Sequence, residues 1–139
     1  MNDDVHAALD IAPDASSRER TVDITTYGAS SGEPRRIEIW FHHVDGRWFL
    51  SGSPGRRDWY ANLLKDPRMV VHLKHGVTAD VAARGVQITD PHEKRRLVTL
   101  ILHGLERMGG WTTASAENID AWTRGSPLVE IEFEENSTP

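Results

Sequence analysis

The chain has 139 residues, a formal net charge of −5 and no cysteine. This length favours a single domain, and the absence of cysteine excludes disulfide bonds, thiolate metal sites and cysteine nucleophiles. The negative charge argues against non-specific binding to nucleic acid or to an anionic membrane, because both need a basic surface. No stretch approaches the roughly 18 apolar residues of a membrane span, and the N-terminus has no apolar run of the secretory type. We therefore expect a soluble protein located in the cytoplasm.

The N-terminal segment differs in composition from the rest of the chain. Residues 1–18 are acidic, and only Val5 to Ile11 has the pattern of a short helix, which Pro13 and the Ser16–Ser17 pair end. We interpret residues 1–18 as a flexible, poorly packed leader that precedes one domain over residues 19–139.

Three strands are expected after the leader. Residues 21–28 (TVDITTYG) and 35–44 (RRIEIWFHHV) alternate between apolar and polar side chains, which is typical of strands. Asp45-Gly46 is a strong hairpin signal, so residues 47–52 (RWFLSG) are predicted to return antiparallel to the second strand. The pattern indicates a meander.

The remainder of the chain mixes helices and strands. A helix is predicted over residues 58–66, because Trp59 and Leu63 form an apolar stripe and Pro67 ends it. Further strands are expected at 69–74, 77–89 and 127–134, and further helices at 90–105 and 119–125. Six short strands with hairpin signals predict an α+β, mainly β fold: a small antiparallel barrel with two or three flanking helices.

Two Gly/Ser-rich turns are each followed by a pair of arginines. The loop 28–34 precedes Arg35 and Arg36, and the turn Ser51–Gly55 precedes Arg56 and Arg57. If the sheet is a meander, both turns lie together on the barrel rim, where backbone N–H groups, a helix N-terminus and guanidinium groups can bind a phosphate. Ordinary exposed turns are the alternative interpretation.

The tryptophans and histidines suggest a pocket but no metal site. Trp111 and Trp122 flank a Gly/Ser/Thr-rich loop, and together with Trp40 they are candidates for an apolar acceptor pocket. Core packing is the alternative for Trp48 and Trp59. The histidines are poorly spaced for chelation, since the adjacent His42 and His43 point to opposite faces of a strand.

One stretch of sequence resembles a known family. The run TTYGASSGEPRRIEIWF, followed by LSGSPGRRDWYANLLKDPRMVVHLK, is similar to the deazaflavin-dependent nitroreductase family over about residues 21–86. The resemblance implies a split β-barrel related to the pyridoxamine-phosphate oxidases, and a homodimer with cofactor sites at the interface. It also implies an oxidoreductase that uses reduced coenzyme F420 to pass a hydride to quinones, nitro compounds or other activated electrophiles.

The resemblance also implies roles for single residues. Arg35 matches an arginine that contacts the cofactor phosphate, and Ser53 matches a serine near the reacting face of the ring, which makes Ser53 the candidate catalytic residue. Trp59 and Tyr60 match an aromatic pair at the start of the helix that packs over the cofactor. The complete predicted cofactor-binding set is Arg35, Arg36, Ser51, Gly52, Ser53, Pro54, Gly55, Arg56, Arg57 and Trp59.

The chain departs from the family pattern in two places. Ala29 and Ser30 stand where the family carries basic residues, and Arg36, Arg56 and Arg57 are the candidates to compensate. The C-terminal stretch TTASAENIDAW contains no tyrosine to donate a proton, which disfavours nitro reduction. Two alternatives stay open: the same fold using FMN, and a non-catalytic protein that binds a flavin or a deazaflavin.

Overall fold

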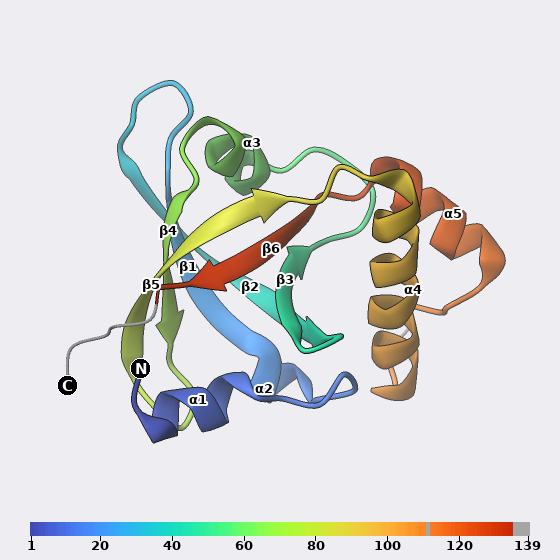
Figure 1. Ribbon diagram of the computed structural model, residues 1–139, viewed down its shortest axis with the longest axis horizontal. Coiled ribbons are helices and arrows are strands. Elements are labelled where there is room, and N and C mark those ends of the chain that lie inside the picture. Colours follow the sequence, from blue (N-terminus) through green and yellow to red (C-terminus); the bar gives the residue numbers. More distant parts are fainter. Residues whose placement is uncertain (111, 135–139) are drawn as a thin grey trace.

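Six strands form one closed antiparallel barrel in the computed structural model, which describes residues 1–110 and 112–134. Around the barrel the strand order is β1-β2-β3-β6-β5-β4, which confirms the predicted six-stranded antiparallel barrel (Figure 1). The strands are β1 (Thr21–Tyr27), β2 (Pro34–Val44), β3 (Arg47–Ser51), β4 (Arg68–Leu73), β5 (Ala79–Gln87) and β6 (Leu128–Phe133).

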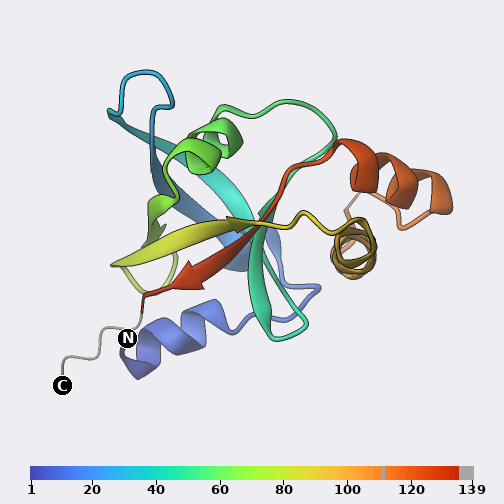
Figure 2. The same cartoon turned by 45° about the horizontal axis from the view of Figure 1, so that its top comes forward.

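Helices cover both ends and one side of the barrel. The described residues form α1 (Asp3–Leu9), α2 (Ser17–Arg20), α3 (Asp58–Lys65), α4 (Pro91–Arg107) and α5 (Ala116–Gly125). Figures 1 and 2 show α1 and α2 across one end of the barrel, α3 across the opposite end, and the α4–α5 pair beside it. The helices are more numerous than the two or three expected, because the N-terminal segment is helical as well. No described helix has the length and apolar character that crossing a membrane requires.

Strand β2 is the longest of the six strands and pairs with its two neighbours in succession. Residues 34–40 pair with β1, and residues 41–44 pair with β3. The β2–β3 turn has the positive φ angles of a tight hairpin, 58° at Asp45 and 67° at Gly46. The Asp45-Gly46 hairpin prediction is confirmed.

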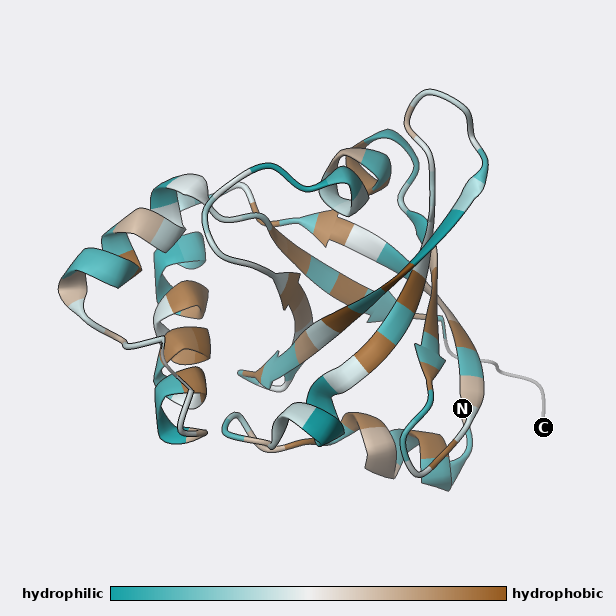
Figure 3. Cartoon of the chain, turned by 180° about the vertical axis from the view of Figure 1, so that it is seen from behind, coloured by the Kyte–Doolittle hydropathy of each residue, from teal (hydrophilic) through white to brown (hydrophobic). Residues whose placement is uncertain are grey.

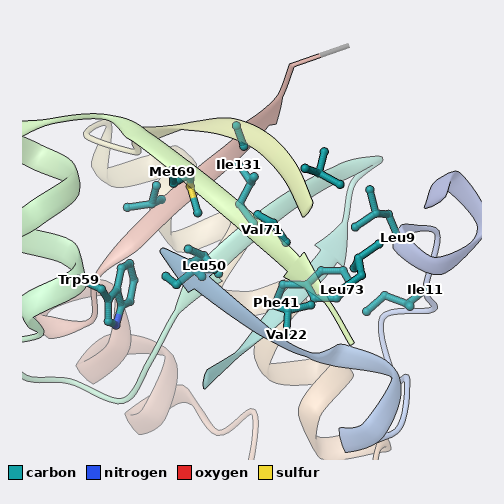
Figure 4. Close-up of a cluster of buried hydrophobic side chains, with 14 of the residues drawn as sticks. Leu9, Ile11, Val22, Phe41, Leu50, Trp59, Met69, Val71, Leu73 and Ile131 are labelled. Atoms are coloured by element: carbon teal, nitrogen blue, oxygen red, sulfur yellow. The ribbon is translucent and has the colours of Figure 1, made fainter. Parts of the chain in front are cut away.

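Hydrophobic and hydrophilic residues alternate along the strands (Figure 3). The buried apolar side chains form two hydrophobic clusters, one on each side of the sheet. Inside the barrel, the fully buried Leu50 and Val71 belong to the same cluster as Trp59 from α3 (Figure 4). Outside it, side chains of β2, β3 and β6 pack against α4 and α5, with Phe49 fully buried. The helix pair therefore lies against the outer face of the sheet.

The N-terminal segment contributes to the barrel core, contrary to the expectation of poor packing. Leu9 is fully buried, and Val5, Ile11 and Ala15 are buried beside it at the end of the barrel that α1 covers. The Val5 and Leu9 spacing places both on one face of α1, toward the barrel. The division into residues 1–18 and 19–139 stays a prediction.

Gly104 offers a test of how tightly this segment packs on α4. A Cβ atom at Gly104 would lie 2.2 Å from the Pro13 carbonyl oxygen, which is a backbone atom that cannot rotate away. Replacing a mid-helix glycine by alanine normally stabilises a helix by about 0.5–1 kcal/mol. Because of the clash we expect Gly104→Ala instead to lower the free energy of unfolding by about 1–3 kcal/mol, measured by chemical denaturation. His103→Ala, at an exposed position of the same helix, is the control; a stabilised Gly104→Ala variant would contradict the close packing.

Candidate functional site

The first pocket lies at the barrel end that α3 covers. It has a volume of about 400 Å³ and is lined by Thr26, residues 28–31, Arg35, Ile37, Asp58, Trp59, Ala61 and Asn62. Asn62 holds its walls together, since its amide donates to the Thr26 hydroxyl at 3.0 Å and its carbonyl accepts from the Ala29 N–H at 2.9 Å. Asn62 was not identified from the sequence as a site residue. The signal that could have identified it is its position as a polar residue in the buried stripe of an amphipathic helix.

Arg35 is the arginine in the described lining of the first pocket, and its guanidinium is available to bind a ligand. Its side chain is 54% exposed, and its ion pair with Glu33 is long, at 3.5 Å. Arg36 points to the opposite face of β2, where it donates to Asp23 at 3.0 Å. Hydrogen bonds from Lys74 and Arg36 hold the pKa of the Asp23 carboxyl below its ordinary value, which marks this pair as part of an ionic network on the outer face.

Backbone N–H groups supplement Arg35 in the first pocket. Helix α3 begins without a side-chain cap, so its first N–H groups are free to face an anion, with Asp58 as the acidic residue on the same rim. Among the described residues, the N–H groups of Ser30 and Ser31 have no hydrogen-bond acceptor. An arginine beside uncapped N–H groups is the arrangement that binds a phosphate.

The second pocket lies between the outer face of the sheet and the α4–α5 pair. Its volume is about 190 Å³, and its described lining is Trp40, His42, Ser51, Gly52, Ser53, Leu105, Met108, Gly110, Thr112 and Trp122. The structure thus brings Trp40 and Trp122 together with the Ser51–Ser53 turn. Trp111, the third candidate for this pocket, lies outside the described residues.

The turn after β3 is stabilised by its own neighbours. Ser51 donates to the Pro127 carbonyl at 2.7 Å, and Arg57 donates to the Ser53 carbonyl at 2.9 Å. The Gly55 N–H donates to the Gly125 carbonyl at 3.1 Å, and Pro54 packs against the same glycine. Arg57 therefore acts within the turn, while Arg56 is exposed and lines neither pocket.

The expectation that the two Gly/Ser turns meet on the rim is wrong. Tyr27, at the end of β1, pairs with Pro34, whereas Ser51, at the end of β3, follows Leu50, which pairs with Phe41. The turn ends are therefore separated along most of β2, which at about 3.3 Å per residue amounts to roughly 20 Å. Of the predicted cofactor-binding residues, Arg35 and Trp59 line the first pocket, and the Ser51–Ser53 turn lines the second. The other predicted residues line neither of these two pockets: Arg36, Pro54, Gly55, Arg56 and Arg57.

From the sequence, His42 was considered only as a metal ligand, and not as a residue of the second pocket. Its side chain is buried, and its Nδ1 lies 3.1 Å from Nη1 of the fully buried Arg20. Burial and the charge of Arg20 lower the pKa of His42 to about 3. A pattern of alternating residues cannot reveal this pairing, because Arg20 comes from a different segment.

Comparisons with known proteins identify the family and the fold of the chain. The family model described as F420H(2)-dependent quinone reductase matches residues 17–106. No curated protein matches the chain by sequence. A conserved hypothetical protein from Mycobacterium tuberculosis, Rv2991, has a similar structure, with a TM-score of 0.69 and 19% identity over 97% of this chain and 82% of that chain.

Two further structures share the fold. An F420-H2 dependent reductase, FDR-A, has a TM-score of 0.56 and 19% identity over 81% of this chain and 94% of that chain. The heme storage protein HutZ from Vibrio cholerae has a TM-score of 0.60 and 17% identity over 96% of this chain and 89% of that chain. The matched segment includes β1 to β5, α3 and most of α4, and with them the first pocket and the Ser51–Gly55 turn. The chain belongs to the F420H2-dependent quinone reductase family of oxidoreductases, whose cofactor is coenzyme F420.

Proposed function

We propose that the protein binds reduced coenzyme F420 with a phosphate at the first pocket and reduces a quinone-like acceptor in the second. The observation that carries this proposal is that Arg35, whose ion pair is long and exposed, lines a pocket with uncapped N–H groups. The same strand, β2, also supplies Trp40 to the separate second pocket. The matched family supports the cofactor.

The residues of the first pocket fit a phosphate-bearing cofactor. Arg35 can form charge-assisted hydrogen bonds, and the N–H groups of Ser30 and Ser31 can add neutral ones. Trp59 gives the same pocket an apolar wall. Reduced coenzyme F420, when bound, supplies the hydride; the chain binds and orients it and excludes water from the reacting groups.

The lining of the second pocket favours a quinone-like acceptor over a nitro compound. Neither tyrosine of the chain, Tyr27 or Tyr60, is in its described lining, so no phenol is present there to protonate a nitro group. Trp40 and Trp122 provide apolar walls for a planar ring. We propose that Ser53 lies at the reacting face, as the resemblance implies, and that the enzyme acts in the cytoplasm.

The assignment is tested by cofactor binding and turnover. We expect purified protein to bind oxidised coenzyme F420 in a fluorescence titration and, with the reduced cofactor, to reduce menadione. Arg35→Gln should weaken cofactor binding about 10- to 100-fold, because a charge-assisted hydrogen bond contributes roughly 1.5–3 kcal/mol.

Arg36→Gln is the matched comparison, since Arg36 pairs with Asp23 on the other face of β2 and should leave cofactor affinity unchanged. Tight FMN binding with no binding of coenzyme F420 would replace the proposal by the FMN alternative. Cofactor binding without reduction of any of several quinones would favour a non-catalytic binding protein.

We also propose that the protein is a homodimer. Ile37 and Trp40 are each more than one third exposed although both line a pocket, and an adjoining subunit would cover such apolar surface. Light scattering coupled to gel filtration should give about twice the 15.6 kDa mass of the chain. A single peak at the monomer mass at micromolar concentration would refute the dimer.

A further inference from the structure

The buried guanidinium of Arg20 fixes which nitrogen of His42 carries the proton. Arg20 donates to the Ala15 carbonyl from Nε and Nη2, at 3.0 and 2.9 Å, and to the Pro13 carbonyl from Nη2 at 2.9 Å. Its Nη1 lies 3.1 Å from His42 Nδ1. A guanidinium has no acceptor, so Nδ1 must accept this hydrogen bond and the proton of the neutral ring resides on Nε2.

The Nε2–H of His42 is a donor that the fold leaves unused. Among the described residues, nothing accepts a hydrogen bond from Nε2, although the side chain is 5% exposed and lines the second pocket. Because Nδ1 faces Arg20, the opposite edge of the ring is the one left for the pocket. Nε2 is not one of the fully buried polar atoms without a partner in the described part of the chain, so the pocket leaves it accessible, and an oxygen of a bound ligand can accept its hydrogen bond.

The remaining lining restricts the ligand that fits. No described lining residue carries a charged side chain, so the pocket favours a neutral molecule. Its volume of about 190 Å³ is below the roughly 300–1,000 Å³ of sites for drug-sized ligands, which limits the occupant to one or two rings. Of the two serine hydroxyls, that of Ser51 already donates to the Pro127 carbonyl.

We propose that His42 binds the electron acceptor by donating a hydrogen bond from Nε2–H to its carbonyl oxygen, and that Arg20 is the positioning residue that holds His42 in this tautomer. The acceptor class is a neutral one- or two-ring quinone or a similar ring carbonyl compound. This inference rests on the proposed function, because it names the acceptor contact of the same site.

His42 acts as a hydrogen-bond donor and keeps its proton. Reduction of a quinone to a hydroquinone takes one hydride, which the reduced cofactor supplies, and one proton. Transfer of the hydride to a carbon or an oxygen of the quinone leaves a negative charge on a ring oxygen. A proton from water then neutralises this charge. A neutral imidazole is too weak an acid to give up its N–H, so its contribution is to orient the oxygen and stabilise its developing charge.

Replacing His42 by asparagine separates the two roles of the ring. In His42→Asn the side-chain carbonyl can still accept from Arg20, while the N–H groups of the shorter amide side chain do not extend to the position of Nε2. We expect kcat/KM for menadione with reduced coenzyme F420 to fall about 10- to 100-fold, somewhat less than the loss of a full oxyanion-hole donor. The affinity for coenzyme F420, from fluorescence titration, should be unchanged. His103→Asn, at an exposed position of α4, should match the wild type in both measurements.

A second readout needs neither cofactor nor turnover. In ¹⁵N NMR spectra of the wild-type protein, His42 should show the Nε2–H tautomer, should not titrate between pH 5 and 8, and should shift at Nε2 when menadione is added. This measurement decides the question even if His42→Asn fails to fold.

The outcomes separate this inference from the proposed function. A wild-type protein that does not bind coenzyme F420 contradicts the proposed function, while the menadione shift at His42 still tests the contact. Normal cofactor binding with an unperturbed His42 resonance, or wild-type kcat/KM in a folded His42→Asn variant, overturns the inference alone. Loss of cofactor affinity in His42→Asn would also overturn it, because the cofactor ring would then occupy the pocket.

Discussion

The double pairing of β2 is the constraint from which the arrangement of both pockets follows. One strand pairs first with β1 and then with β3, so it must continue past the end of each neighbour. Side chains alternate along a strand, so Arg35 and Ile37 share a face with Thr26 under α3, whereas Trp40 and His42 point toward α4 and α5. One rigid element therefore sets the position of Arg35, the proposed phosphate ligand, relative to the proposed acceptor pocket, and neither depends on a loop alone.

The buried Arg20 extends this control to the N-terminal segment. A guanidinium taken out of water is tolerated only when its donors are matched, and here the acceptors are two carbonyls of the preceding turn and the His42 ring. Its charge also lies 6.0 Å from the centre of the Trp40 ring, within the range of a cation–π contact. Loss of residues 1–18 would thus remove the Pro13 and Ala15 carbonyls that hold the Arg20 guanidinium against His42 and Trp40. The segment serves the pocket as well as the core.

The local signals in the sequence were sufficient for the elements but not for how distant elements meet. Alternation located all six strands, Asp45-Gly46 located the hairpin, and Trp59 with Leu63 located the buried stripe of α3. The β3–β6 and β1–β4 pairings join segments far apart in the chain, and no short pattern encodes them. The same limitation explains why the two Gly/Ser-rich turns were wrongly expected to meet. Their separation depends on how far β2 extends between its pairing with β1 and its pairing with β3, and the sequence does not show where the second pairing begins. Arg20 in the run SSRERT looks like any solvated arginine until Pro13, Ala15 and His42 surround it.

Ion pairing explains how a chain with a net charge of −5 can still offer a cation to an anionic cofactor. Arg36, Arg47, Arg68 and Arg96 each contact a carboxylate at 3.0 Å or less. Arg57 is bound to carbonyls of its own turn. Arg35 differs from these, since its contact with Glu33 is at 3.5 Å and exposed to solvent, where such a pair contributes little. A phosphate can therefore replace Glu33 as the partner of Arg35 at a small cost in free energy. Binding of a phosphate to Arg36 would first require breaking its shorter contact with Asp23. Two adjacent arginines that look equivalent in the sequence are distinguished by the strand face that each occupies.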